Sequence, residues 1–148
     1  MKRLTKIAAV ALVLGLLAAI AVSALVIEGT GTLKARGAGI ARVSGDGAVD
    51  IRGHGVGTLW VRNAETLSAS GRGVRIDLPR GIVFFGGWSG EIRASGEELT
   101  VTMAGGLIQF AATGTGTAFL QGRGRYWLNG EDGEWSLTGT TIQLETTQ

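Results

Sequence analysis

The sequence contains no cysteine and only one proline, Pro79, among 148 residues. Without cysteine the chain has no disulfide, no thiolate metal ligand and no cysteine that could carry a lipid, so redox chemistry does not indicate its compartment. Twenty-six glycines accompany the single proline. Glycine in this excess, with neither proline nor a Gly-X-Y period, excludes collagen and argues against a disordered linker.

Residues suited to catalysis are also scarce. The one histidine, His54, stands between two glycines in a predicted turn, and nothing near it in the sequence would orient it as a base or ligand. A Gly-x-Ser-x-Gly elbow, a phosphate-binding Gly-x-Gly-x-x-Gly and a calcium loop are all missing. The acidic cluster at 131–134 is typical of a hairpin tip, with a structural calcium site as the alternative. We therefore expect no catalytic residue, no cofactor and no metal site, and a hydrolytic enzyme is the least favoured alternative.

The first 27 residues differ from the rest in composition. A short basic start is followed by residues 7–27, which are uncharged and almost wholly apolar. As a helix, this segment would span roughly 30 Å, the thickness of the hydrocarbon core of a bilayer. Basic residues on the short N-terminal side keep that side in the cytoplasm. We expect 1–27 to be a signal anchor in the cell membrane, with 28–148 exported as one glycine-rich β domain. Cleavage near residues 22–24 is the alternative and would make the protein a secreted one.

The overall charge of +2 arises from the N-terminal segment. Setting aside Lys2, Arg3 and Lys6 leaves eleven basic residues against twelve acidic ones in the exported part. Charges of both signs are interspersed there, which is typical of a solvated surface. A nucleic-acid partner would require a basic face, so none is expected.

Residues 29–61 follow a strict period of two. Gly-x-Gly recurs every eight residues, starting at Gly29, Gly37, Gly45 and Gly53, and every odd position is glycine or apolar. This pattern predicts strands with one buried face. Gly-Thr-Gly-Thr at the start of this stretch returns at 114–117, which indicates an internal repeat.

The parity of the apolar positions also predicts the turns. Three-residue loops at each Gly-x-Gly would keep the parity and pair Leu33 with Val43 and Val43 with Val49. Dipeptides such as Arg72–Gly73 and Gly105–Gly106 would form two-residue loops and switch it. Between 82 and 85, either Ile82 and Phe84 or Val83 and Phe85 point inward. Other inward positions predicted in this way are Ala41, Leu67, Ala69, Ile76, Leu78, Trp88, Ile92, Ala94, Val101, Met103, Ile108, Phe110, Leu120, Tyr126, Leu128, Trp135, Leu137, Ile142 and Leu144.

The predicted fold is all-β. Sequential hairpins give an antiparallel meander of about 14 short strands, rolled into a flattened barrel or a two-layer sandwich. One N-terminal membrane helix precedes it. The alternative is a β-solenoid with straight sides and glycine corners, because eight-residue repeats with constant parity also fit that architecture.

Three aromatic residues are predicted to point outward: Trp60, Phe119 and Trp127. Phe119 and Trp127 are expected to lie opposite each other on adjacent strands, forming a patch for a glycan or for a second copy of the chain. The plainer interpretation is a cross-strand aromatic pair without a ligand. The favoured function is a non-catalytic, membrane-anchored, extracytoplasmic domain with a structural or adhesive role at the cell surface. A carbohydrate-binding module that uses these three residues and Tyr126 is the alternative.

Overall fold

The structure is a computed structural model in which residues 25–145 are described. They are almost entirely β, which confirms the predicted fold class. One open sheet contains all the strands, and it is antiparallel except where β1 and β6 pair in parallel. The elements are β1 (Leu25–Thr30), β2 (Thr32–Arg62), β3 (Thr66–Leu78), a single 3₁₀ turn (Pro79–Gly81), β4 (Ile82–Leu128), β5 (Glu131–Glu134) and β6 (Thr140–Glu145).

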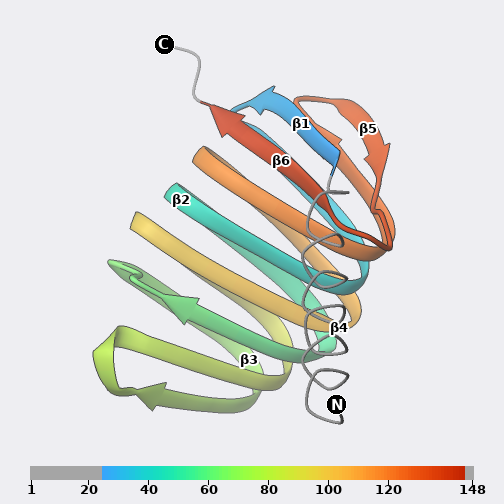
Figure 1. The fold of residues 1–148 in the computed structure, drawn as a ribbon. Coiled ribbons are helices and arrows are strands. Elements are labelled where there is room, and N and C mark those ends of the chain that lie inside the picture. The colour runs from blue at the N-terminus through green and yellow to red at the C-terminus, as the bar shows by residue number, and fades with distance from the viewer. Residues whose placement is uncertain (1–24, 146–148) are drawn as a thin grey trace, which may run out of the picture.

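The two longest strands are wound into a flattened coil (Figure 1). β4 pairs with β2 along both edges of β2, so that Val43 lies beside Val101 on one edge and beside Ala118 on the other. These two partners are 17 positions apart in β4, and elsewhere along the coil the two β4 partners of one β2 residue are 16 to 18 positions apart. One turn of the coil therefore takes about this many residues. Each turn of β2 is hydrogen-bonded to a turn of β4 on either side of it.

The coil is one long hairpin wound on itself. Its tip is the 3₁₀ turn at Pro79–Gly81, where β3 pairs with the beginning of β4. The remainder of β4 runs back along β2 in the opposite direction. The tip therefore lies at one end of the coil, and β1, β5 and β6 lie at the other (Figure 1).

Each turn bends at pairs of glycines from neighbouring strands. Gly47 lies beside Gly114, and both have positive φ, +151° and +133°. A Cβ atom at Gly47 would overlap the carbonyl oxygen of Thr113 and approach the Cα atom of Gly114 to 2.9 Å. The two backbones are thus in direct contact, which only glycine allows.

The straight sides between the corners bury their inner faces against each other. Ile51 and Ile92 from one side line a small internal gap together with Leu59 and Phe85 from the other. Alternation along each strand places the buried residues in one hydrophobic cluster. The indole of Trp135 is buried near the β5 end and donates a hydrogen bond to the carbonyl of Arg125 at 3.2 Å.

Most of the predicted inward positions are confirmed, and between 82 and 85 it is Val83 and Phe85 that point inward. Ile76, Leu78 and Leu137 were wrongly assigned, because all three are exposed. No parity switch occurs at Arg72–Gly73, since Gly73 belongs to a corner and the odd positions stay on the inner face. Leu137 is 66% exposed because it lies in the turn that the Gly139 amide closes on Ser136.

The predicted count of about 14 short strands and the hairpin pairing are wrong. Leu33 pairs with Ala112 and Leu128 rather than with Val43. Hydrogen bonding continues through the glycine corners, so the hairpin turns expected at 37–39 and 45–47 are bends within one continuous strand. Straight sides with glycine corners are features of the solenoid alternative. This coil, however, is built from two antiparallel arms, β2–β3 and β4, whereas a simple solenoid is wound from a single strand of chain.

The predicted membrane segment lies almost wholly outside the described residues. Its last three residues, 25–27, form the start of β1. Within 25–145 we find no helix with the length and apolar character needed to cross a membrane.

We expect Gly47→Ala to lower the free energy of unfolding by about 3 kcal/mol, because the methyl group meets the backbone of the neighbouring strand at positive φ. Urea unfolding of the full chain, followed by far-UV circular dichroism, measures this. The matched control is Gly106→Ala, where an added Cβ has no neighbour within 4 Å. Equal unfolding midpoints for the two variants would contradict the close approach at the corners.

Candidate functional site

The outer face of one side of the coil carries four of the five ion pairs among the described residues. We call it the polar face. Its residues come from turns that are far apart in the sequence and are brought together by the register. One row across the strands runs Asp132, Trp127, Lys34, Ala111, Asp50, Arg93. A second row contains Glu134, Arg125, Arg36, Gln109, Arg52 and Glu91.

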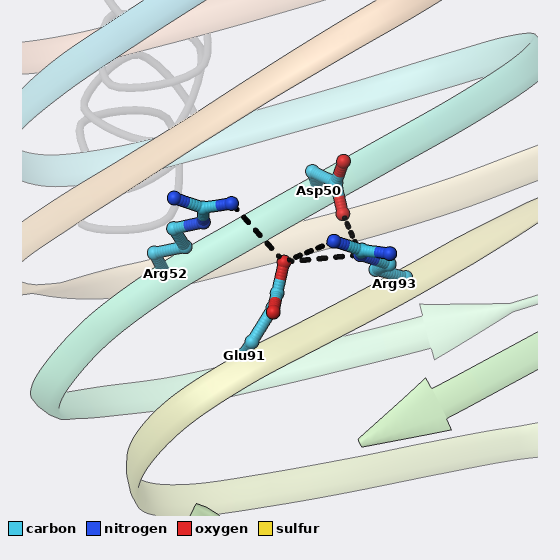
Figure 2. A network of polar contacts seen from close by, with 4 residues as sticks. All are labelled: Asp50, Arg52, Glu91 and Arg93. Carbon is cyan, nitrogen blue, oxygen red and sulfur yellow. Dashed lines mark hydrogen bonds and ion pairs between the residues drawn. The ribbon is translucent and has the colours of Figure 1, made fainter. Parts of the chain in front are cut away.

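One half of the polar face carries an ion-pair network of four residues, Asp50, Arg52, Glu91 and Arg93 (Figure 2). The Glu91 carboxylate accepts hydrogen bonds from Arg93 at 2.8 and 3.0 Å, and a longer one from Arg52 at 3.4 Å. Arg93 also forms an ion pair with Asp50 at 2.9 Å. Exposed pairs of this kind contribute little to stability. They do fix the orientation of two arginines and compensate their charge.

The same contacts shift the proton equilibria of the network. Hydrogen bonding from Arg93 holds the pKa of the Glu91 carboxyl below its usual value, and the nearby charges of Arg93 and Arg52 act in the same direction. The bond to Glu91 in turn raises the pKa of the Arg93 guanidinium. Glu91 therefore stays ionised to lower pH than a free glutamate.

Next to the network lies a hollow of about 490 Å³. It forms because Ala111, a short side chain, stands between Lys34 and Asp50 in the first row. The residues that line the hollow are Lys34, Ala35, Arg36, Asp50, Arg52, Gln109, Phe110, Ala111 and Trp127. Its volume is within the range of small-molecule sites in proteins.

Charge in the hollow is unbalanced. Asp50 and Arg52 are engaged in the network, and neighbouring Arg125 is paired with Asp132 at 2.6 Å. Lys34 and Arg36, by contrast, make no ion pair with any of the residues that the structure describes. Two uncompensated cations therefore border the hollow, beside the exposed indole of Trp127.

The three predicted aromatic residues are exposed or half-buried on the outer surface, but they do not form one patch. Trp127 lies on the polar face, beside Lys34 and Asp132. Phe119 and Trp60 lie on the opposite side of the coil, where Phe119 pairs with Arg42. Direct pairing of Phe119 with Trp127 is thus wrong.

The physical reason is the corner between them. Gly122 and Gly124 pack against Gly39 and Gly37, so the chain bends to the other side of the coil where a hairpin loop was expected. His54 likewise lies within β2 rather than in a hairpin turn.

Sequence reasoning missed Lys34, Arg36, Gln109 and Ala111. Lys34 and Arg36 lie at even positions of β2, which the period of two predicts to point outward. Gln109 and Ala111 lie in the part of β4 that pairs with them. Nothing local marks them as a group, because their proximity depends on pairing between residues about 75 positions apart, as between Lys34 and Ala111 and between Arg36 and Gln109. Within residues 25–145, no group of three histidine, cysteine or acidic side chains is arranged to hold a metal ion.

Two of the three comparisons with known proteins find no match for this chain. No protein-family model and no curated protein matches it. Among solved structures it is similar to a non-cellulosomal cohesin from the hyperthermophilic archaeon Archaeoglobus fulgidus, with 11% identity over 83% of this chain and 88% of the cohesin chain. The TM-score is 0.16, which supports no conclusion about fold or function.

The pKa of Glu91 provides a test of the network. A carboxyl with a lowered folded pKa stabilises the fold above its unfolded pKa, and this stabilisation is lost as pH falls through the folded value. Carboxyl NMR should show Glu91 titrating below its ordinary value of 4.5, and Arg93→Gln should raise the midpoint towards that value. Arg125→Gln, which removes the partner of Asp132 instead, should leave Glu91 unchanged. A midpoint for Glu91 that is indifferent to Arg93→Gln would show that the two side chains are not paired in solution.

Proposed function

We propose that this chain is a non-catalytic, extracytoplasmic adhesion domain that binds an acidic carbohydrate on its polar face. The observation that carries the proposal is the hollow over Ala111, where the Trp127 indole stands beside two uncompensated cations. Indole rings stack on the apolar faces of sugar rings. Gln109 supplies an amide that can donate to and accept from hydroxyl groups.

The charges favour a sugar that carries carboxylate groups. Arg36 presents a planar guanidinium, which matches a carboxylate in bidentate geometry, and Lys34 adds a second positive charge across the first row. Asp50, the acidic residue of the hollow, is neutralised by Arg93. A uronic acid or a comparable acidic sugar therefore fits these side chains better than a neutral one.

A binding role agrees with the chemistry of the carboxyls better than a hydrolytic one. Glycoside hydrolysis needs one carboxyl with a raised pKa to act as the general acid. In the polar face, Arg93 contacts both Glu91 and Asp50, and the pKa of Glu91 is lowered. That is the opposite of what a general acid requires.

We further propose that the N-terminal segment retains the domain at the outer surface of the cell membrane, with the N-terminus in the cytoplasm. The basic start and the apolar run 7–27 support this arrangement. On this proposal the domain is held at its β1 end.

Glycan arrays followed by calorimetry on the full chain test the ligand. We expect binding to acidic glycans, and Trp127→Ala should weaken it about tenfold or more, because a stacked side chain contributes about 1.5–3 kcal/mol. Arg36→Gln should reduce the preference for acidic over neutral glycans.

Trp60→Ala is the matched control, since Trp60 is an exposed tryptophan on the opposite side of the coil. An equal loss of binding in Trp60→Ala and Trp127→Ala would locate the site elsewhere. If no glycan binds, the adhesive role is wrong and a purely structural role is favoured.

N-terminal sequencing of the mature protein tests the anchor. We expect the intact N-terminal segment, together with protease sensitivity of the domain on whole cells. A mature chain that starts at Leu25 would instead show cleavage after residues 22–24 and a secreted protein.

A further inference from the structure

β3 is an edge strand. Residues Thr66–Leu78 pair with β4 on one side, and on the other side they have no strand partner among residues 25–145. The strand is 13 residues long and contains neither proline nor lysine, the residues that most often block an edge. Its free edge therefore presents unpaired N–H and C=O groups to a further strand.

The end of this strand is apolar on its outer face. Val74, Ile76 and Leu78 are 56%, 45% and 37% exposed. Ile76 lies beside Phe84, whose ring packs on Trp60 with ring centroids 4.7 Å apart. We call these five residues the tip patch. A contiguous apolar surface that reaches the edge of a sheet is typical of an interaction site.

The inner face of the same segment carries one charge of each sign. Arg75 and Asp77 form an ion pair at 3.1 Å, and the Arg75 guanidinium lies 5.6 Å from the ring centre of Phe85. Both charged side chains remain substantially exposed, because the coil ends at this strand. The segment thus alternates apolar residues outside with a cation and an anion inside.

We propose that two copies of this chain pair edge to edge through β3, antiparallel about a twofold axis at Ile76. In this register Ile76 lies opposite the partner's Ile76, and Val74 lies opposite the partner's Leu78. Arg75 lies opposite the partner's Asp77, which gives two opposite-charge cross-strand pairs. The sheet and the tip patch then continue from one copy into the other.

The charges select this register over its neighbours. An antiparallel shift that centres the axis on Arg75 places that residue opposite the partner's Arg75, and a shift to Asp77 brings two aspartates together. Like charges directly opposite each other are destabilising. A slip by one residue would set a charged side chain against an apolar one. Only the register centred on Ile76 makes the segment complementary to itself.

Charge exchange on the full chain in detergent micelles tests the pairing. We expect sedimentation equilibrium to show a dimer for the wild type, and a dissociation constant at least about tenfold higher for Asp77→Arg and for Arg75→Asp, each of which sets like charges opposite each other. An equimolar mixture of the two variants should form heterodimers about as tightly as the wild type. Recovery in the mixture requires Arg75 and Asp77 to meet across the interface.

A cross-linking experiment covers the case in which a charge variant fails to fold. The chain has no cysteine, so Ile76→Cys introduces a single thiol at the axis. Residues directly opposite each other in an antiparallel pair lie within disulfide reach. Ile76→Cys should give a covalent dimer on mild oxidation, whereas Leu137→Cys, an exposed control outside β3, should not.

The proposal would be overturned by a monomeric wild type, by a mixture as weak as its separate components, or by equal cross-linking at positions 76 and 137. Strong self-association that none of these variants alters would assign the interface to another surface, and would equally overturn it.

Discussion

The contact of backbone on backbone at the glycine corners is the constraint on which the rest of the structure depends. At Gly47 and Gly114, as at Gly45 and Gly116, two strands bend together with no side chain between them. Because both strands bend at the same place, their hydrogen bonding continues from one side of the coil to the other. The inner faces are thereby held parallel and close, and small residues such as Ala41 and Ala118 fill the space between them.

Because the coil is flattened, it has two outer faces, one with a polar ion-pair network and one with exposed aromatic and apolar residues. Neighbouring strands are about 4.8 Å apart, so residues from distant turns meet at fixed spacing along each row. On the polar face, this spacing places Lys34 next to Trp127 and brings Arg93 to Asp50. The opposite side carries Trp60 and Phe84, which lie close to the free edge of β3. Binding of a ligand and association of copies can therefore use separate surfaces of one coil.

From the sequence one can predict whether a side chain points into the core or outward, but not which residues of other strands lie beside it. Alternation places Val43 and Leu120 in the core, because the period of two is a local property of an extended chain. A Gly-x-Gly hairpin and a Gly-x-Gly corner keep the same parity, so periodicity cannot distinguish them. It predicts Leu33 beside Val43, whereas the partners of Leu33 are Ala112 and Leu128. The same ambiguity hid the polar hollow, since it arises from pairing between arms. Trp127 could be identified as an outward aromatic residue, whereas its neighbours required the register.

Within residues 25–145, the tip at Pro79–Gly81 is the only place where the two arms of the coil, β2–β3 and β4, are also neighbours along the chain. Leu78 lies beside Ile82 there, whereas Leu33 at the far end of the coil lies beside Leu128. Closing a short loop costs less entropy than closing a long one, so pairing should begin at the tip and proceed outwards, and contacts of this separation make folding slow. During synthesis, all of β2 is made before any residue of β4 exists. Its apolar positions then stay without partners until the second arm has emerged.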